Sequence, residues 1–179
     1  DLYVFNCYLG LRYSDLNNLA PHLFTPREVA GNKYVVYRGR AQKTDQMVEF
    51  ALHPCAIRIL EKYKYLLPKM RVDDFNALIK KVALKAGLSE VQRIKEFRGN
   101  ETIIRDVPKY QLMSSHAGRR SFCTNFYVEG VSIAAIMSIS GHTTEHEFRK
   151  YIKKASVRLE VVAQQVFAVP GTNVNLNVA

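Results

Sequence analysis

The sequence predicts a mixed fold of helices and short strands, and three observations support this. Apolar residues recur with a 3.6-residue period from Phe75 to Ala86, which is typical of an amphipathic helix. Two short apolar segments, 33–38 and 47–52, flank a polar turn and favour paired strands. Several glycines directly follow apolar segments, as glycine often does at helix ends. With 179 residues, 47% of them hydrophobic, the chain is long enough for a single domain with a substantial core.

The N-terminal region predicts two short helices with a break between them. Residues 2–9 are apolar and compatible with a helix that Gly10 ends. Ser14 is expected to cap the second helix. Arg12 therefore falls in the break, where backbone N–H groups and the helix dipole favour an anion.

The middle of the chain predicts a strand pair followed by two helices. Lys43 lies in the polar turn between the two strands. Pro54 suits the first turn of a helix. Asp73 or Asp74 is expected to cap the next helix, which Gly87 ends.

The C-terminal part predicts a β-hairpin and then three helices. Residues 91–97 and 102–107 flank Arg98-Gly99-Asn100, a sequence that favours a tight turn. The helices follow Pro108. Residues with strong helix-ending or helix-capping preferences separate them: Gly130, Ser132, Gly141 and Thr144.

Composition limits the classes of function. The formal net charge is +10 and the pI about 9.6. Such a charge favours polyanions through long-range attraction and counterion release, although a merely basic protein would show the same composition. The three cysteines form no Cys-x-x-Cys pair, which indicates reduced thiols in a cytoplasmic protein. No apolar run approaches the roughly 20 residues that a membrane span needs.

A set of side chains suited to phosphoryl transfer is spread along the chain: Arg12, Lys43, His116, Arg119, His142 and Tyr151. Arginine suits phosphate oxygens because its planar fork donates two hydrogen bonds and stays charged. A tyrosine, with a pKa near 10, becomes a nucleophile only where cations stabilise its phenolate. A flexible lysine can protonate a leaving oxygen. Each residue alone has an ordinary alternative as a solvated charge or a packed ring.

The two histidines have different predicted roles. His116 and Arg119 are three residues apart, so they share a helix face, and Ser114 or Ser115 would cap that helix. His116 would act as a general base or an orienting group. His142 follows Gly141 in a turn, where it would donate a hydrogen bond to a phosphate oxygen.

One alternative reading of His142 is a zinc ligand. His142-Thr-Thr-Glu145-His146 matches the His-x-x-Glu-His pattern of a zinc-peptidase class, with Glu160 as a candidate third ligand. That pattern needs both histidines on one continuous helix. Here Gly141 and the Thr144 cap place His142 before the helix, so no metal is expected.

The candidate residues lie in segments that resemble a known family in order and spacing. The segments are Leu-Gly-Leu-Arg-Tyr-Ser-Asp-Leu at 9–16, the turn with Lys43, His-Ala-Gly-Arg-Arg-Ser-Phe-Cys-Thr at 116–124, Gly141-His142 and Tyr151. Together they resemble the catalytic domain of the tyrosine recombinases, the phage and conjugative-transposon integrases. The resemblance runs from about residue 3 to 153. The 91–107 hairpin resembles an insertion found in integrases of some conjugative and mobilizable transposons.

The resemblance implies a mainly helical fold with a small antiparallel sheet and a reaction without metal, ATP or other cofactor. Tyr151 would attack the scissile phosphate and form a 3′-phosphotyrosine. Arg12, Arg119 and His142 would stabilise the transition state, His116 would help to move protons, and Lys43 would be the acid. The rival functions are a type IB topoisomerase and a non-catalytic DNA-binding module on the same scaffold.

The resemblance also implies an organisation and partners. Residues 1–179 would be one catalytic domain of a longer bacterial integrase, with an amino-terminal DNA-binding domain elsewhere. Residues 156–179 would form a C-terminal helix and tail, either exchanged between protomers or packed in cis. The expected partners are double-stranded DNA, further copies in a tetramer and accessory DNA-bending proteins. The expected location is the cytoplasm, in association with the nucleoid.

Overall fold

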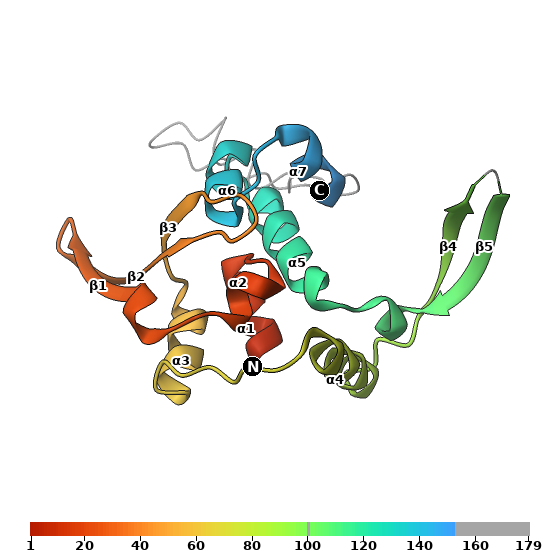
Figure 1. Ribbon diagram of the computed structural model, residues 1–179, viewed down its shortest axis with the longest axis horizontal. Helices are drawn as coiled ribbons and strands as arrows, with labels where there is room; N and C mark the ends of the chain where they lie inside the picture. The colour runs from red at the N-terminus through yellow and green to blue at the C-terminus, as the bar shows by residue number, and fades with distance from the viewer. Residues whose placement is uncertain (100, 153–179) are drawn as a thin grey trace, which may run out of the picture.

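The computed structural model describes residues 1–99 and 101–152. It is a mainly helical fold with small antiparallel sheets, as the sequence predicts (Figure 1). The chain begins with α1 (Leu2–Leu9) and α2 (Tyr13–Asn17). The predicted cap at Ser14 is wrong, because α2 starts at Tyr13 and its N-cap is Arg12, two residues before Ser14. Arg12 nevertheless lies in the break between the helices, as expected.

The turn after α1 requires glycine. Gly10 adopts a left-handed conformation with φ +66°, and its N–H donates to the carbonyl of Asn6. A Cβ built on Gly10 would lie 2.3 Å from the ring of Phe122. The turn is also held by Asn6, whose side chain bonds both the N–H and the carbonyl of Leu11. Arg12 therefore leaves a turn whose backbone is closely fixed.

A three-stranded antiparallel sheet follows the short 3-10 helix η1 (Pro21–Leu23). Its order is β1 (Phe24–Val29), β2 (Asn32–Arg40) and β3 (Met47–Ala51). The predicted pair corresponds to β2 and β3, and Arg40 faces Met47 across the turn that carries Lys43. The sequence analysis predicted no strand at β1, which contains Pro26. As an edge strand, β1 tolerates this proline.

Two helices and a hairpin connect the sheet to the C-terminal helices. They are α3 (Pro54–Lys62), α4 (Val72–Lys85), β4 (Val91–Arg98) and β5 (Glu101–Pro108), followed by η2 (Lys109–Leu112). The β4–β5 hairpin is confirmed and projects away from the body (Figure 1). The predicted cap at Asp73 or Asp74 is wrong, because Arg71 is the N-cap of α4. Both carboxylates lie in the first turn, where their negative charge interacts favourably with the helix dipole.

Three helices complete the described chain: α5 (Ser115–Val128), α6 (Ile133–Ser140) and α7 (Glu145–Ile152). Their boundaries agree with the predicted glycine and serine positions. Ser114 is the N-cap of α5, but its side chain makes no capping bond. Instead, the N–H of Ser115 donates to Oδ1 of Asn76 on α4, 2.7 Å away. A tertiary contact thus replaces the local cap.

The core has two apolar clusters, which adjoin where α1 packs against α5. The larger one gathers the N-terminal helices, the sheet, α3 and α4, with Phe5 and Leu60 fully buried. The smaller one joins α5, α6 and α7 around Phe122, Ile136 and Phe148. In Figure 1, α5 runs between the N-terminal helices and the α6–α7 pair. The predicted site residues therefore come from both sides of the boundary between the two clusters.

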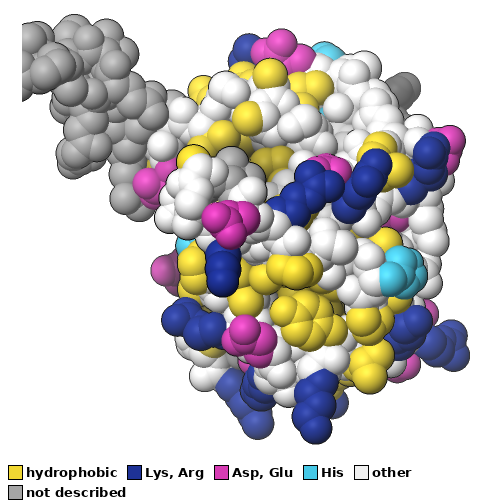
Figure 2. All heavy atoms as spheres, turned by 90° about the vertical axis from the view of Figure 1, so that its left-hand side faces the viewer, with side chains coloured by type: hydrophobic (Ala, Val, Ile, Leu, Met, Phe, Trp, Pro, Cys, Tyr) yellow, Lys and Arg dark blue, Asp and Glu magenta, His cyan; other side chains and the backbone are white. Residues whose placement is uncertain are grey.

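The surface is basic and interrupted by apolar area. In Figure 2, lysine and arginine side chains are spread around a central apolar patch. Within residues 1–99 and 101–152, no helix is long and apolar enough to cross a bilayer. The predicted C-terminal helix and tail at 156–179 lie outside the described residues.

Candidate active site

Arg119 is the central side chain of the candidate site. It lies on α5 and is only 2% exposed. Its Nη1 donates to the carbonyl of Gly10, 2.7 Å away, and to the carbonyl of Ser140. Its Nη2 lies 3.1 Å from Nε2 of His142. This guanidinium therefore ties the turn after α1 to the end of α6.

Arg12 brings a second guanidinium to the same place. Its Nη2 donates to the carbonyl of Gly141 at 3.3 Å. Its Nη1 is buried and has no hydrogen-bond partner within the described part of the chain. Burial lowers the pKa of Arg119, and the charge of Arg12 lowers it further. Two neighbouring cations, one with an unused buried donor, form a site that favours an anion.

His142 occupies the turn between α6 and α7, three residues before α7 begins. It is 8% exposed, and its Nδ1 lies 2.7 Å from Oγ of Ser140. Burial, and then the charges of Arg119 and Arg12, lower the pKa of His142 to about 4. The imidazole is thus neutral at pH 7 while no anion occupies the site.

Tyr151 stands beside His142. The two rings meet edge to face, with centroids 5.0 Å apart. Arg119 also donates a side-chain hydrogen bond to Tyr151, and the guanidinium of Arg120 lies 6.0 Å from the Tyr151 ring centroid. Thr124 Oγ1 on α5 donates to the backbone carbonyl of Tyr151 at 3.1 Å. The phenol therefore lies next to the cations that a tyrosine nucleophile requires.

His116 and Lys43 are exposed and lie at the edge of the cluster. Burial lowers the pKa of His116, and the charges of Arg119, Arg120, Arg12 and Lys43 lower it further. The structure thus places His116 and Lys43 within electrostatic reach of one another and of both arginines. It shows no direct bond from either side chain to the central group.

Hydrogen bonds from two neighbouring elements hold the turn that carries Lys43. Oδ1 of the buried Asp15 accepts a hydrogen bond from the N–H of Gln42 at 3.0 Å. At the end of β2, Arg40 binds the side chain and the carbonyl of Asp45. The carboxylate of Asp15 thus holds the backbone next to Lys43.

The sequence analysis missed several residues that build the site. Ser140 was not considered, although it directly precedes Gly141-His142 and so had to lie close to that histidine. Asn6 and Thr124 also support the site through the backbone of Leu11 and Tyr151. Their signal in the sequence is weak, because a buried polar side chain on an apolar helix face is recognised only when its partner is known.

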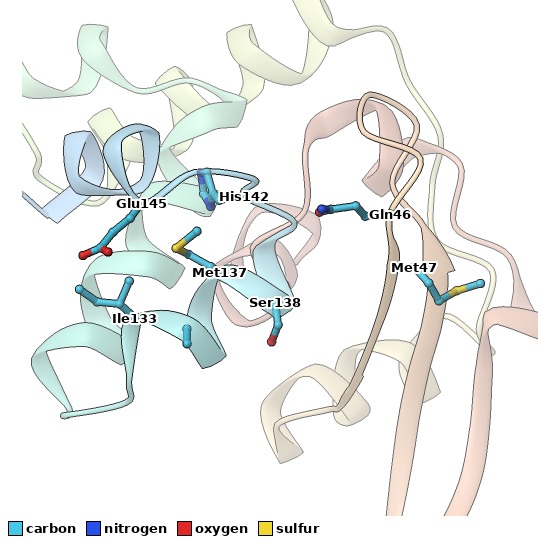
Figure 3. Close-up of a pocket in the computed structure, with 8 residues that line it drawn as sticks. Gln46, Met47, Ile133, Met137, Ser138, His142 and Glu145 are labelled. Carbon is cyan, nitrogen blue, oxygen red and sulfur yellow. The ribbon is translucent and has the colours of Figure 1, made fainter.

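A pocket of about 610 Å³ lies beside the cluster and shares His142 with it. Figure 3 shows its two walls, with Gln46 and Met47 on the strand side and Ile133 and Met137 on the helix side. Its walls combine apolar and polar side chains. The arginines do not line this pocket, so it is separate from the anion-binding arrangement.

The zinc pattern does not form a continuous helical pair. His142 precedes α7, whereas His146 lies within it. Among residues 1–99 and 101–152, no three His, Cys, Asp or Glu side chains are grouped so that they could hold a metal ion. Glu160, the candidate third ligand, lies outside the described residues.

Solved structures with the same arrangement of elements identify the fold. The XerH site-specific recombinase bound to palindromic difH substrate superposes with a TM-score of 0.58 at 18% identity, covering 91% of this chain. The XerA recombinase gives 0.55 at 15% identity over 89%. The Tn1549 transposon integrase in complex with circular intermediate DNA gives 0.53 at 15% identity over 91%. The chain has the fold of a tyrosine recombinase catalytic domain.

The recombinase fold is shared at low sequence similarity. No protein-family model and no curated protein sequence matches the chain. The chain spans about half of the chains it resembles: 44% of the XerH recombinase, 53% of the XerA recombinase and 55% of the Tn1549 integrase. The contacts that join Arg12, Arg119, His142 and Tyr151 are observed in the structure of this chain and do not depend on the comparisons.

Proposed function

We propose that the chain is the catalytic domain of a tyrosine recombinase that cleaves and rejoins DNA through a covalent 3′-phosphotyrosine at Tyr151. One observation carries the proposal. Two guanidiniums, an imidazole and a phenol from distant parts of the sequence converge on one spot, and a buried donor of Arg12 is left without a partner. The recombinase fold supports this assignment.

The arginines would bind the scissile phosphate. Both N–H groups of Arg119 Nη1 are directed at backbone carbonyls and Nη2 lies against His142, so Nε and the second N–H of Nη2 would serve the phosphate oxygens. Arg12 would add its free Nη1. Such donors are fixed before the substrate arrives, so they stabilise the charge that develops in the transition state without reorganising.

Tyr151 would supply the nucleophile. Its Oη attacks phosphorus, the bond from phosphorus to the 5′-oxygen breaks, and the departing oxygen takes a proton from Lys43. The phenol's proton passes to a neutral histidine, and the lowered pKa of His116 keeps that ring neutral. The products are a 3′-phosphotyrosine and a 5′-hydroxyl.

Rejoining would reverse these steps. A 5′-hydroxyl from a second strand attacks the phosphotyrosine and releases Tyr151. The phosphoester bond energy is retained in the intermediate, so neither ATP nor a metal ion is needed to reseal the strand.

The proposal extends to the partners of the chain. The charge of +10 suits a DNA duplex. Strand exchange requires two duplexes and hence several protomers, and we propose a tetramer on DNA with accessory DNA-bending proteins. Integration and excision of a mobile element in a bacterial nucleoid would be the setting. An amino-terminal domain would complete the grip on DNA, so the 179-residue chain alone is expected to bind weakly and exchange strands poorly.

The test is to trap the covalent intermediate. The chain at high concentration is incubated with a pool of randomised duplexes that carry nicks, so that the short 5′-hydroxyl fragment diffuses away after cleavage. Adducts that survive denaturant are collected, the DNA is sequenced and the modified residue is mapped by mass spectrometry. We expect the modification on Tyr151.

Tyr127→Phe is the matched control, because Tyr127 packs against the same apolar cluster as Tyr151. It should still form the adduct, whereas Tyr151→Phe should not. Adducts on another tyrosine, or none in the pool, would contradict the proposal. Relaxation of supercoiled plasmid without any preferred site would favour the topoisomerase alternative.

A further inference from the structure

Ser140 makes two short contacts that together determine the position of one proton. The residue ends α6 and is 3% exposed. Its Oγ lies 2.7 Å from the carbonyl of Ile136, one helical turn earlier, and 2.7 Å from Nδ1 of His142. Both distances are those of good hydrogen bonds to a hydroxyl.

A hydroxyl group has only one hydrogen to donate. The carbonyl of Ile136 can only accept, so the hydrogen of Ser140 Oγ must point to it. The lone pairs of Oγ then face Nδ1 of His142, which must carry a hydrogen to donate. The thiol of Cys123 also neighbours this hydroxyl. A thiol can donate to the second lone pair of Oγ, so it does not have to compete with the carbonyl of Ile136 for the serine hydrogen.

The other nitrogen of the ring agrees with this assignment. Nη2 of Arg119, which can only donate, lies 3.1 Å from Nε2 of His142 and 3.3 Å from Nδ1. Because Nδ1 carries the hydrogen that faces Ser140 Oγ, Nε2 is the nitrogen that accepts from Nη2. In a neutral imidazole with hydrogen on Nδ1, Nε2 is an acceptor. The carbonyl of Ile136 therefore selects the tautomer through Ser140, and the shorter contact of Arg119, to Nε2, is compatible with it.

We propose that Ser140 is a positioning residue that holds His142 with hydrogen on Nδ1 and none on Nε2. His142 can then donate from Nε2 to an anion only after it gains a proton. The tautomer is inferred from contacts within the chain. That the bound anion is a DNA phosphate rests on the proposed function. Anion binding at this site is thus coupled to proton uptake by one histidine.

The charges around the ring explain why the coupling is strong. Arg119 on α5 and Arg12 before α2 disfavour the imidazolium, while Glu147 on α7 favours it weakly. Tyr151 on α7 contacts the ring edge to face. A bound dianion would oppose the two guanidiniums and allow His142 to become charged.

The tautomer is read directly from the ¹⁵N chemical shifts of the imidazoles in the chain labelled on its five histidines. His142→Gln assigns the signal. We expect wild-type His142 to show hydrogen on Nδ1. Ser140→Thr, which keeps the hydroxyl, should retain that pattern. Ser140→Ala should shift the population at least several-fold towards hydrogen on Nε2. Hydrogen on Nε2 in the wild type would overturn the proposal even if Ser140→Ala failed to fold.

Proton uptake is measured with sulfate, whose charge is constant from pH 6 to 8. Sulfate affinity of the wild type should fall as the pH rises, by up to about tenfold per unit, because only the protonated ring donates. Ser140→Ala should weaken this dependence and Ser140→Thr should restore it. The series is run in a His116→Gln background, so that the other nearby imidazole does not contribute. An affinity that is independent of pH in the wild type would contradict the coupling.

These outcomes are separable from those of the proposed function. A chain with the expected tautomer that forms no DNA adduct would sink the recombinase proposal and leave the role of Ser140 intact. A chain that forms the adduct but carries hydrogen on Nε2 would do the reverse.

Discussion

Arg12 and Arg119 each bind the turn that holds the other in place. Arg119 donates to the carbonyl of Gly10, two residues before Arg12, and to that of Ser140. Arg12 donates to the carbonyl of Gly141, the next residue along. These hydrogen bonds to backbone carbonyls hold the two positive charges close together. Such an arrangement disfavours the empty site and favours a bound anion.

Arg119→Lys should be strongly destabilising. A lysine has its three N–H donors on one nitrogen, which cannot occupy the separate positions of Nη1 and Nη2, so buried acceptors would lose their partners. We expect a loss of about 2–4 kcal/mol in the free energy of unfolding, measured by urea denaturation. Arg93→Lys on the exposed hairpin, where the pair with Asp106 is solvated, is the control and should change stability by less than about 0.5 kcal/mol.

Arg12→Gln should separate stability from anion binding. It removes one of two repelling charges, so the free energy of unfolding without anion should change by less than about 1 kcal/mol. Sulfate is expected to raise the melting temperature of the wild type, and this rise should be largely lost in Arg12→Gln. Arg38→Gln, which removes an exposed charge from β2, should keep that response. A full sulfate response in Arg12→Gln would show that the anion binds elsewhere.

Gly10→Ala should lower the free energy of unfolding by more than the strain of a left-handed backbone alone would cause. Its Cβ would collide with the ring of Phe122 in addition to the strain of φ +66°. We expect at least about 2 kcal/mol of destabilisation by chemical denaturation. Gly87→Ala, with φ +79° and nothing within 4 Å, isolates the backbone strain and should cost about 1 kcal/mol. Equal losses at the two positions would mean that Phe122 moves aside without cost.

Acid should destabilise the chain through His142. Its pKa is about 4 in the folded chain against 6.5 as the ordinary value, so the unfolded state binds more protons between these limits. Stability is complete above about pH 6.5 and decreases as the pH falls to about 4, by at most about 3 kcal/mol from this group. The lowered pKa of His116 acts in the same direction. His142→Gln should flatten this part of the curve of unfolding free energy against pH, and an unchanged slope would argue against the assignment.

The sequence predicted the fold well where local chemistry decides it. Glycine ends α1 and α6 and follows α4 and α5 closely, and the polar turn with Lys43 joins β2 and β3 as expected. It failed where tertiary contacts override local preference. Ser14 was a reasonable cap, yet Arg12 takes that position because the turn before it is bound by Asn6. Ser114 likewise gives way to Asn76 at the start of α5.

The candidate site was predicted by residue type and order, and its geometry was not. Spacing alone could place His116 and Arg119 on one helix face. It could not show that Arg119 is buried while His116 is exposed, because that depends on how α1 and α6 pack against α5. The role of Ser140 was beyond reach for the same reason, since it rests on distances between three elements.

Thr124 and Arg119 hold the site together through contacts between elements that are distant in the sequence. Every part of the anion-binding arrangement depends on both apolar clusters being docked on α5. A nascent or partly unfolded chain would therefore present Tyr151 without its neighbouring cations. Under the proposed function, the contacts that complete the fold would thus also withhold DNA cleavage from incomplete molecules.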